Sequence, residues 1–551
     1  MPVKITFLGG LNEIGKNMTM IEYGNDAIIV DCGMTFPDSE MLGIDVVIPD
    51  FTTVIQNKDR IKGIVLTHGH EDHIGGLPFL LKEVNLPLYG SKLTLALVES
   101  KLKEHGLDKK AKMHVVSEGQ TTRFGKISVE YIHVNHSIPD ALALAIKTPT
   151  GVIVHTGDFK IDSTPISGDI IDLSRFGALG NDGVLALLCD STNVERPGYT
   201  PSERVVGESL TGLFRKAEKK RIIVATFSTN LHRIQQIMDA AVKEHRHVAL
   251  SGRSMINVVN IASELGYLKM PKNLLVDIEK INNYPKSRMI IVTTGSQGEP
   301  MSALTRMASS EHKQVEVGEG DYIIISATPI PGNEKSVSRV VNDLMNRGCN
   351  VVYEKMYDVH TSGHACQEEL KIIHSLVKPK FFIPVHGEQR HLRKHAMLAK
   401  SMGMKDKDIL ISDIGQVVAL TQTKMSVVGT APAGKVLVDG LGVGDIGTYV
   451  LKDRQHLSQD GIIVIAATID KYTGDIVSGP CVESKGFVYM KESEDLIEEI
   501  REMTEAIIFD CFKGHTHEWK MMRKRIKDDI AKKVFQKTKR SPIIVPIIMS
   551  D

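Results

Sequence analysis

The segment Thr67–Gly76, which reads THGHEDHIGG, constrains the chain more than any other stretch. It directly follows an apolar run, so four potential metal ligands stand at the end of a predicted strand: His68, His70, Asp72 and His73. Gly69 lets the backbone turn tightly enough for these side chains to converge. The adjacent aspartate and last histidine cannot both point easily at an ion held by the first two histidines. The spacing therefore indicates two metals side by side.

The chain has 551 residues, more than one hydrophobic core usually serves, so we expect several domains. Hydrophobic residues make up 42% and charged residues 24%, which is typical of a soluble globular protein. Lys plus Arg equals Asp plus Glu at 67 each, so no overall positive field draws the chain to nucleic acid. Contacts with phosphates would have to come from a local groove.

The six cysteines are scattered without CxxC spacing, which favours neither a disulfide framework nor a thiolate zinc site. The N-terminal stretch MPVKITFLGG lacks the long apolar core of a signal peptide, and no later apolar run is long enough to span a bilayer. We therefore expect the chain in the cytoplasm, without contact to a membrane.

Five segments are distinguished by their patterning. Residues 1–205 alternate short strands with glycine turns, and residues 206–348 alternate strands with amphipathic helices, which predicts an inserted parallel α/β domain. Residues 349–415 return to the first pattern. The stretch 416–448 is rich in glycine and small residues and is the predicted connector. Residues 449–551 predict a small C-terminal α+β domain, with expected strands that include Gly486–Met490.

More ligand candidates stand at the ends of distant predicted strands. The motifs NHSIPD, HTGDF and PVHGE supply His136, Asp158 and His386. A lone histidine is more often an incidental polar residue than a ligand, but the HxHxDH pattern after an apolar strand favours metal binding. The combination predicts a metal-dependent hydrolase.

Together, these motifs resemble those of the metallo-β-lactamase superfamily, and the insert is similar to that of its β-CASP nuclease branch. Asp190 in CDSTN, His364 in HTSGH and His386 in PVHGE match the three extra motifs of that branch. A histidine at the last motif is the pattern of RNA-acting members, whereas DNA-acting members tend to have valine. Order, spacing and tail are similar to the bacterial ribonuclease J family over essentially the whole chain. The resemblance implies an α/β fold: an αββα sandwich, an inserted β-CASP domain and a small C-terminal α+β domain, which would serve oligomerisation or RNA binding.

The resemblance also implies an activity. It is that of a ribonuclease with 5′–3′ exonuclease and endonuclease action, which hydrolyses RNA phosphodiesters by a two-metal-activated hydroxide in mRNA decay and rRNA maturation. Its expected substrate is RNA, especially 5′-monophosphorylated RNA. The expected assembly is a homodimer or homotetramer, with a paralogue or an RNA-degrading complex as further partners.

The metal ligands are expected to divide into two sets with one bridge. The first set is His68, His70 and His136, the second is Asp72, His73 and His386, and Asp158 bridges them. Imidazole-rich ligation favours two Zn²⁺ per subunit, although Mn²⁺ or Mg²⁺ would also support turnover. Asp439 is either a ligand of a structural Ca²⁺, as in relatives, or a solvated turn aspartate.

Catalytic and substrate contacts also follow from the resemblance. Asp72 would orient the hydroxide, and His364, polarised by Asp190, would either protonate the leaving 3′ oxygen or stabilise the phosphate. The expected substrate contacts are His360, Thr361, Ser362, Gly363 and His364, with Ser228, Thr229, Asn230 and Arg253 in the insert. The STN segment opens a predicted helix, so an ordinary helix N-cap is the alternative there.

Three other functions compete with this interpretation. A thioester or lactam hydrolase would share HxHxDH but lack the insert and HTSGH. A DNA-processing β-CASP nuclease is disfavoured by His386. A non-catalytic RNA-binding or scaffold subunit of an RNA-degrading complex is disfavoured by the complete ligand set.

Overall fold

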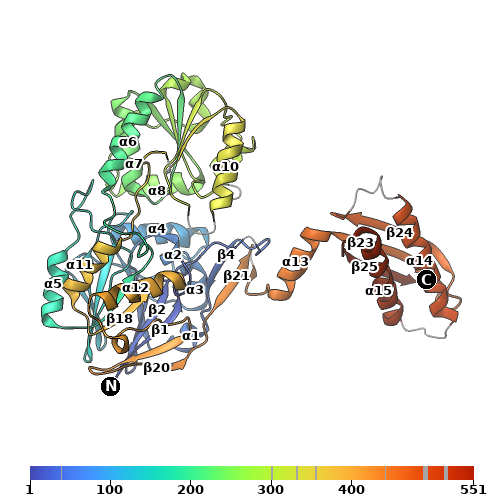
Figure 1. Ribbon diagram of the computed structural model, residues 1–551, viewed down its shortest axis with the longest axis horizontal. Helices are drawn as coiled ribbons and strands as arrows, with labels where there is room; N and C mark the ends of the chain where they lie inside the picture. Colours follow the sequence, from blue (N-terminus) through green and yellow to red (C-terminus); the bar gives the residue numbers. More distant parts are fainter. Residues whose placement is uncertain are drawn as a thin grey trace. The chain divides into compact units, whose positions relative to one another are not determined.

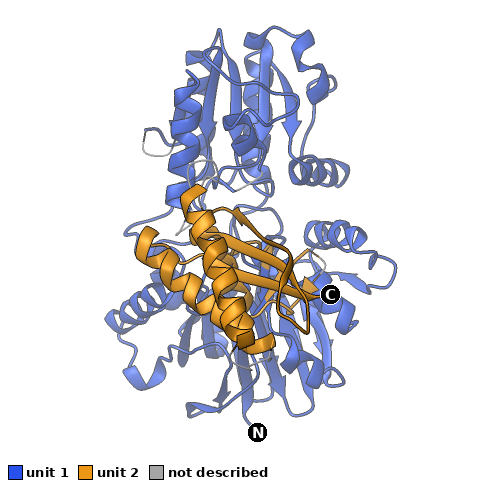
Figure 2. Ribbon diagram, turned by 90° about the vertical axis from the view of Figure 1, so that its right-hand side faces the viewer, with its two compact units in different colours: residues 1–36, 47–436 blue, residues 37–46, 437–551 orange. Residues whose placement is uncertain are grey.

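The computed structural model describes residues 1–38, 40–299, 302–329, 333–353, 356–440, 442–487, 494–513 and 519–551. The chain forms two compact units (Figure 2). The larger consists of residues 1–36 and 47–436, and the smaller of residues 37–46 and 437–551. Both combine helices and strands, so the predicted mixed α/β class is confirmed.

The larger unit contains an eight-stranded sheet in the order β20-β19-β1-β2-β3-β5-β6-β7, of which β1, β2 and β20 are labelled in Figure 1. Its strands are β1 (Val3–Gly9), β2 (Met18–Tyr23), β3 (Asp26–Val30), β5 (Ile61–Val65), β6 (Leu88–Gly90), β7 (Met113–Val115), β19 (Gln416–Leu420) and β20 (Met425–Thr430). The same unit contains the helices α2 (Glu71–Ile74), which carries the predicted ligands Asp72 and His73, α3 (Leu77–Glu83) and α4 (Lys92–Glu104). Helix α4 contacts β6 and β7.

A six-stranded sheet follows the order β18-β12-β11-β10-β9-β8. Its strands are β8 (Thr121–Phe124), β9 (Ile127–His133), β10 (Leu142–Thr148), β11 (Gly151–His155), β12 (Val184–Asp190) and β18 (Phe381–Val385). Helices α5 (Leu173–Asp182), α11 (Gln367–Val377) and α12 (Gln389–Ser401) share a hydrophobic core with one of its faces.

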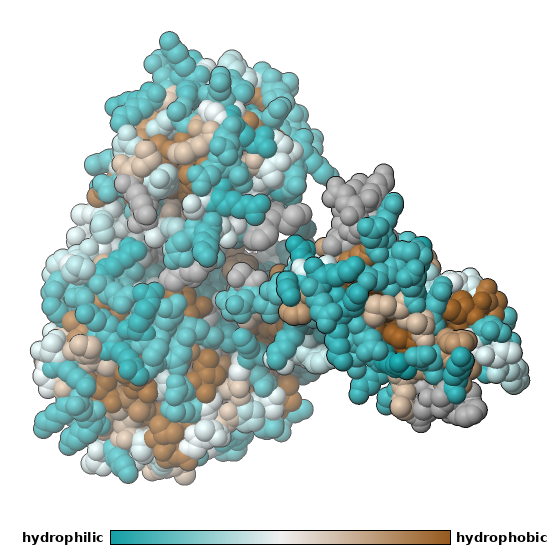
Figure 3. Space-filling model, turned by 45° about the vertical axis from the view of Figure 1, so that its right-hand side comes forward, coloured by the Kyte–Doolittle hydropathy of each residue, from teal (hydrophilic) through white to brown (hydrophobic). Residues whose placement is uncertain are grey.

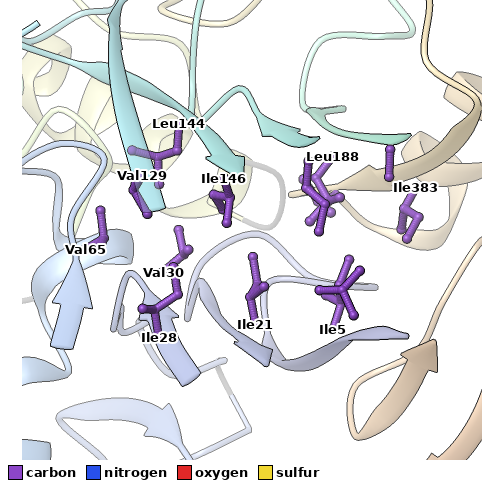
Figure 4. Packing of buried hydrophobic residues seen from close by; sticks show 14 of the residues in the cluster. Ile5, Ile21, Ile28, Val30, Val65, Val129, Leu144, Ile146, Leu188 and Ile383 are labelled. Carbon is purple, nitrogen blue, oxygen red and sulfur yellow. The ribbon is translucent and has the colours of Figure 1, made fainter. Parts of the chain in front are cut away.

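The two sheets pack face to face, as the predicted sandwich requires. Ile5, Ile21 and Ile28 of the first sheet lie in one cluster with Leu144 and Ile383 of the second (Figure 4). Strands buried on both faces have near-continuous apolar sequences rather than alternating ones. Strand β12 follows this rule: every position is buried, and its sequence VLALLCD is apolar up to the final aspartate.

The insert forms a separate parallel sheet in the order β14-β15-β13-β16-β17. Its strands are β13 (Arg221–Ala225), β14 (His247–Ser251), β15 (Met289–Thr293), β16 (Asp321–Ile325) and β17 (Asn350–Tyr353). The helices are α6 (Glu203–Lys216), α7 (Leu231–Lys243), α8 (Arg253–Glu264), α9 (Ala303–Ala308) and α10 (Glu334–Asn346), and they flank the sheet (Figure 1). Thr226, Thr294 and Ser326 directly follow β13, β15 and β16, so the carboxyl edge of this sheet is polar.

The stretch predicted as a connector, residues 416–448, is partly built into the sheets. Strand β19 pairs antiparallel with β1, and β20 pairs with β19. Strands β21 (Lys435–Asp439) and β22 (Gly442–Val443) follow. The glycine content masked the β-branched runs QVVAL and SVV, whose residues favour strands.

The smaller unit contains a three-stranded sheet, β24-β23-β25, with helices α13, α14 and α15. The strands are β23 (Ile462–Ile469), β24 (Ile476–Lys485) and β25 (Ile543–Ser550), and the helices are Thr448–Asp460, Glu494–Lys513 and Trp519–Thr538. The strand predicted at 486–490 is not confirmed: residues 486 and 487 form a bend, and 488–490 lie outside the described residues. Strand β24 was not predicted. Its sequence IVSGPCVESK contains the pair Gly-Pro, which is rare inside strands, and buried and exposed residues alternate only in its second half.

The visible surface of both units is largely hydrophilic, and the apolar side chains form separate patches (Figure 3). Among the described residues, no helix combines the length and the apolarity that crossing a bilayer requires.

Candidate metal centre and active site

The predicted ligands come from the ends of four strands in the two packed sheets. His68 and His70 lie on the loop after β5, and Asp72 and His73 lie in the short helix α2. The other three follow strands of the second sheet: His136 after β9, Asp158 after β11 and His386 after β18. The structure brings all seven together.

Three histidines converge with their ring nitrogens facing each other. His68 Nε2 lies 3.0 Å from His70 Nδ1, and His136 Nε2 lies 3.1 Å from the same atom. Burial lowers the pKa of all three rings, that of His70 to about 4. The rings therefore remain neutral, and their lone pairs are available to a cation.

The second group combines two carboxylates and two histidines, Asp72, His73, Asp158 and His386, whose ligand atoms lie within 4.8 Å of one another. His73 Nε2 lies 3.2 Å from Asp158 Oδ2, and His386 Nε2 lies 3.3 Å from Asp72 Oδ2. Burial alone would lower the pKa of both histidines, but the carboxylates outweigh it and raise the pKa. Apart from this contact with Asp72, the buried His386 Nε2 has no hydrogen bond among the described residues, as expected of a ligand atom whose partner is a cation.

Asp158 stands between the two groups. Its Oδ2 lies 3.7 Å from His68 Nε2 and 3.9 Å from His136 Nε2, while its Oδ1 lies 2.9 Å from His386 Nδ1. Burial opposes ionisation, yet the neighbouring His386 and His73 hold the pKa of this carboxyl well below its usual range. An ionised carboxylate in this place is suited to bridge two cations.

Asp31 contacts the Nδ1 side of the His73 ring, and the sequence alone did not assign Asp31 a role. Its Oδ2 lies 2.7 Å from His73 Nδ1, and its Oδ1 accepts a 2.8 Å hydrogen bond from the Thr67 backbone N–H. A carboxylate on the far nitrogen of a ligating histidine fixes the ring and its tautomer. The available signal was the run AIIVD, an apolar strand that ends in an acid.

Asn17 supports the same loop and was also missed. Its backbone N–H donates to the Asp72 carbonyl over 2.9 Å, and its side-chain amide donates to the same oxygen over 3.2 Å. Gly33 allows its own backbone to lie against that of Asp72, because a Cβ at residue 33 would lie 1.6 Å from the Asp72 carbonyl oxygen. Such a close backbone approach has no local sequence signal beyond the glycine itself.

His364 and Asp190 form a pair beside the ligands. His364 Nδ1 lies 2.7 Å from Asp190 Oδ2, which leaves Nε2 of the ring, one-fifth exposed, to face a substrate. Burial lowers the pKa of His364, but the charge of Asp190 outweighs it and raises the pKa above its ordinary value. The arrangement favours a protonated imidazole near neutral pH, the form that a general acid needs.

Family models match the chain in four parts. The metallo-β-lactamase superfamily model matches residues 11–192, and the ribonuclease J β-CASP domain model matches residues 219–344. The Zn-dependent metallo-hydrolase RNA specificity domain matches residues 350–411, and the ribonuclease J C-terminal domain matches residues 449–550. The predicted fold is thereby confirmed part by part.

Curated relatives match along the whole chain. Ribonuclease J2 of Bacillus subtilis is 44% identical over 99% of this chain and 98% of its own length. The chain belongs to the ribonuclease J family. Ribonuclease J 1 of Streptococcus pyogenes is also 44% identical, over 100% of this chain and 98% of its own length, and ribonuclease J of Synechocystis is 41% identical, over 100% and 87%.

A solved structure shares the fold of this ribonuclease J family member. It is a protein of unknown function from Enterococcus faecalis, 17% identical, with a TM-score of 0.54 over 76% of this chain and 100% of its own. At this identity the likeness supports the fold alone.

The predicted substrate contacts of this ribonuclease J family member occupy two places. In the HTSGH segment, Thr361 donates to the Pro201 carbonyl over 2.8 Å, and Ser362 Oγ accepts from the His364 N–H over 3.2 Å. The buried Nδ1 of His360 has no hydrogen-bond partner within the part of the chain that the structure describes. Burial, with Arg233 nearby, lowers the pKa of His360 to about 3, so this ring is a neutral donor or acceptor.

The second place is the carboxyl edge of the inserted sheet. Asn230 has the geometry of an N-cap, because its side chain accepts from the Arg233 backbone N–H over 3.1 Å. Ser228 and Thr229 are half-buried just before it, and Arg253 is exposed at the start of α8. Helix capping and substrate contact are compatible here, because capping uses the Asn230 side chain and leaves the hydroxyls of Ser228 and Thr229 available to a substrate.

Asp439, the predicted calcium ligand, lies in the smaller unit. Its Oδ2 forms a 2.5 Å ion pair with Arg454, which also donates to the Leu42 carbonyl over 2.9 Å. The nearby Asp45 accepts from the Gly440 N–H over 2.7 Å. Calcium binding here stays a prediction, and Arg454 would have to release Asp439 for it.

Proposed function

We propose that the chain hydrolyses RNA phosphodiesters at the His/Asp centre, both inward from 5′-monophosphorylated ends and at internal sites. The observation that supports this most is the pair of ligand groups on either side of Asp158, with the His364–Asp190 pair beside them. Two comparisons support the choice of RNA. The relatives that match nearly the whole chain are named ribonuclease J, and the RNA specificity domain model matches residues 350–411.

In this proposal His68, His70 and His136 hold one cation, and Asp72, His73 and His386 hold the other, with Asp158 shared. Two cations bound there would lower the pKa of water and neutralise charge on the phosphate oxygens. The neutral histidines favour Zn²⁺, and the carboxylates also suit Mn²⁺ or Mg²⁺. Metal analysis of the purified chain would decide the identity.

A protein side chain would supply the proton that the leaving group needs. The attacking water loses one proton to solvent as its oxygen bonds to phosphorus, the P–O3′ bond breaks, and His364 gives its Nε2 proton to the departing 3′ oxygen. Asp190 keeps the Nδ1–H of that ring engaged and so presents Nε2 to the substrate. Asp72, whose carbonyl accepts hydrogen bonds from Asn17, would orient the attacking water. The products would carry a 5′-phosphate and a 3′-hydroxyl.

The choice between RNA and DNA rests on His386 and on the relatives. Cleavage of RNA and DNA strands of identical sequence, with matched 5′-monophosphate ends, tests it directly. We expect the RNA strand to be degraded much faster, and faster cleavage of DNA would reject the proposed substrate. Comparing 5′-monophosphate with 5′-triphosphate RNA tests the direction, because equal exonuclease rates would argue against a terminal-phosphate pocket.

We also propose a cellular setting for this activity. The reaction fits mRNA decay and rRNA maturation in the cytoplasm, as a homodimer or homotetramer assembled through the C-terminal domain, with a paralogue or RNA-degrading complex as partner. Light scattering of the full chain tests the assembly, and a monomer would exclude it.

A further inference from the structure

The catalytic loop, defined here as Val359–Cys366, is tied to the metal centre at its far end. Its Gly363 carbonyl accepts a 2.7 Å hydrogen bond from His136 Nδ1, the nitrogen opposite the proposed ligand atom. The carbonyl of His364 accepts from Thr200 Oγ1 over 2.8 Å. A shift of this loop would therefore move both the proposed acid and a proposed metal ligand.

The near end of the catalytic loop is held by the inserted domain. The Val359 carbonyl accepts from Arg233 Nη1 over 2.7 Å and from Ser326 Oγ over 2.6 Å. Arg233 lies in the first turn of α7, and Ser326 directly follows β16. Both are fully buried, so water cannot replace these donors.

The Arg233 guanidinium has little freedom to move. Its Nε donates to Glu203 Oε1 over 2.7 Å, which balances the buried charge. Its Nη1 is then shared between the backbone and hydroxyl of Ser326 and the Val359 carbonyl. Charge-assisted hydrogen bonds of this kind are strong, and leaving a buried charged donor without its acceptor is costly. The position of Val359 is thus set by the inserted domain.

We infer that Arg233, together with Ser326, is a positioning residue that sets the catalytic loop from the inserted domain. It acts through Val359 on His364 and on the Gly363 carbonyl that orients His136. The inference rests on the proposed function, since the rate that it affects is RNA hydrolysis. Because one catalytic loop would serve both modes of cleavage, losing this support lowers end-dependent and internal cleavage together.

Arg221 provides a matched control in the same sheet. It is also a buried arginine, and it pairs with Asp321 through contacts of 2.7 and 3.0 Å. Both residues stand at the first positions of β13 and β16, whereas Ser326 follows the end of β16. A change at Arg221 therefore disturbs a comparable ion pair at the opposite edge of the sheet, away from the catalytic loop.

The test compares Arg233→Lys, Ser326→Ala and Arg221→Lys with the wild-type full chain, each supplied with Zn²⁺ or Mn²⁺. The kcat and KM of hydrolysis are measured on a 5′-monophosphate RNA and on a circular RNA that has no ends. We expect Arg233→Lys to lower kcat on both RNAs by about tenfold, since small misplacements of reacting groups cost up to about a hundredfold. Ser326→Ala lowers kcat less, and KM stays close to the wild-type value in both variants.

The outcomes separate the inference from the proposed function. Arg221→Lys should keep its kcat within about twofold, because it touches no reacting group. If Arg233→Lys and Ser326→Ala behave like Arg221→Lys, or change KM alone, the positioning role is overturned while the proposed function stands. If Arg233→Lys fails to fold, Ser326→Ala decides by the same criterion. A wild-type chain that cleaves neither RNA overturns the proposed function and the inference with it.

Discussion

The metal centre and the carboxyl edge of the inserted sheet are both built at strand ends, yet they differ in how firmly their side chains are held. In the metal centre, His73 is fixed by Asp31 and His136 by the Gly363 carbonyl. At the carboxyl edge of the inserted sheet, Ser228 is half-buried and Arg253 is exposed. Groups that act on a reacting bond need to be positioned in advance, whereas groups that bind a flexible strand can adjust to it.

The difference suggests a division of labour. In the proposed function, the metal centre would cleave the phosphodiester, and the carboxyl edge of the inserted sheet would select the end of the RNA. Changes in the first place should therefore abolish turnover, and changes in the second should alter selectivity.

The largest effect is expected from His70→Ala. This change removes a ring whose nitrogen faces two other proposed ligands, so metal content and hydrolysis should both fall. The rate should drop by more than about a hundredfold, since changes in outer partners of a metal site already cost 10- to 100-fold. His133→Ala is the control, because His133 bonds the Asp169 carbonyl instead. Unchanged hydrolysis in the His70 variant would exclude the proposed centre.

A second large effect is expected from His364→Ala, with the metal content retained. Loss of a general acid typically costs about 10²- to 10⁴-fold. The measurement is the single-turnover rate alongside metal analysis. A drop of only a few-fold would leave phosphate stabilisation as the better account of His364.

A moderate effect on the pH profile is expected from Asp190→Asn. The carboxylate of Asp190 raises the pKa of His364, so in the wild type the ring stays protonated to higher pH and the rate falls on the basic side only above that pKa. Without this charge the pKa falls, and the basic limb of the rate profile should move to lower pH. An unmoved basic limb would show that His364 does not supply the proton.

The smallest effect is expected from Ser228→Ala at the carboxyl edge of the inserted sheet. Loss of one hydrogen bond from a half-buried hydroxyl to a charged terminal phosphate costs about 1.5 kcal/mol, or about tenfold in rate. Exonuclease action on 5′-monophosphate RNA should weaken by that amount, while cleavage of circular RNA should not change. Equal losses on both substrates would break the proposed division of labour.

The convergence of the candidate ligands could be predicted because each stands in a short motif directly after an apolar strand. His68 and His70 lie two residues apart, and the strand ends that carry Asp158 and His386 needed only the expectation that strand ends meet. Asp31, Asn17 and Arg233 could not be predicted in the same way. Their roles depend on which strands become neighbours and on which carbonyl comes within reach, and neither is encoded in adjacent residues.

The fold shows the same limit. Doubly buried strands such as β12 were evident as apolar runs, whereas β19 and β20 lay in a glycine-rich stretch that looked like a connector. Strand β19 is held by pairing with β1, more than 400 residues away in sequence by the register Val3 to Leu420, and β20 is held in turn by pairing with β19. Such pairing is decided by the whole sheet rather than by local propensity.

The most direct test of the account is digestion of a 5′-monophosphorylated, end-labelled RNA by the full chain before chelation, after chelation, and after Zn²⁺ or Mn²⁺ is restored. We predict that the untreated chain releases the labelled end, that chelation stops this release, and that added metal restores it in the wild type but not in the His70→Ala variant. Undiminished digestion by the fully metal-free chain, or digestion by His70→Ala at the wild-type rate, would contradict a centre built on these histidines and aspartates.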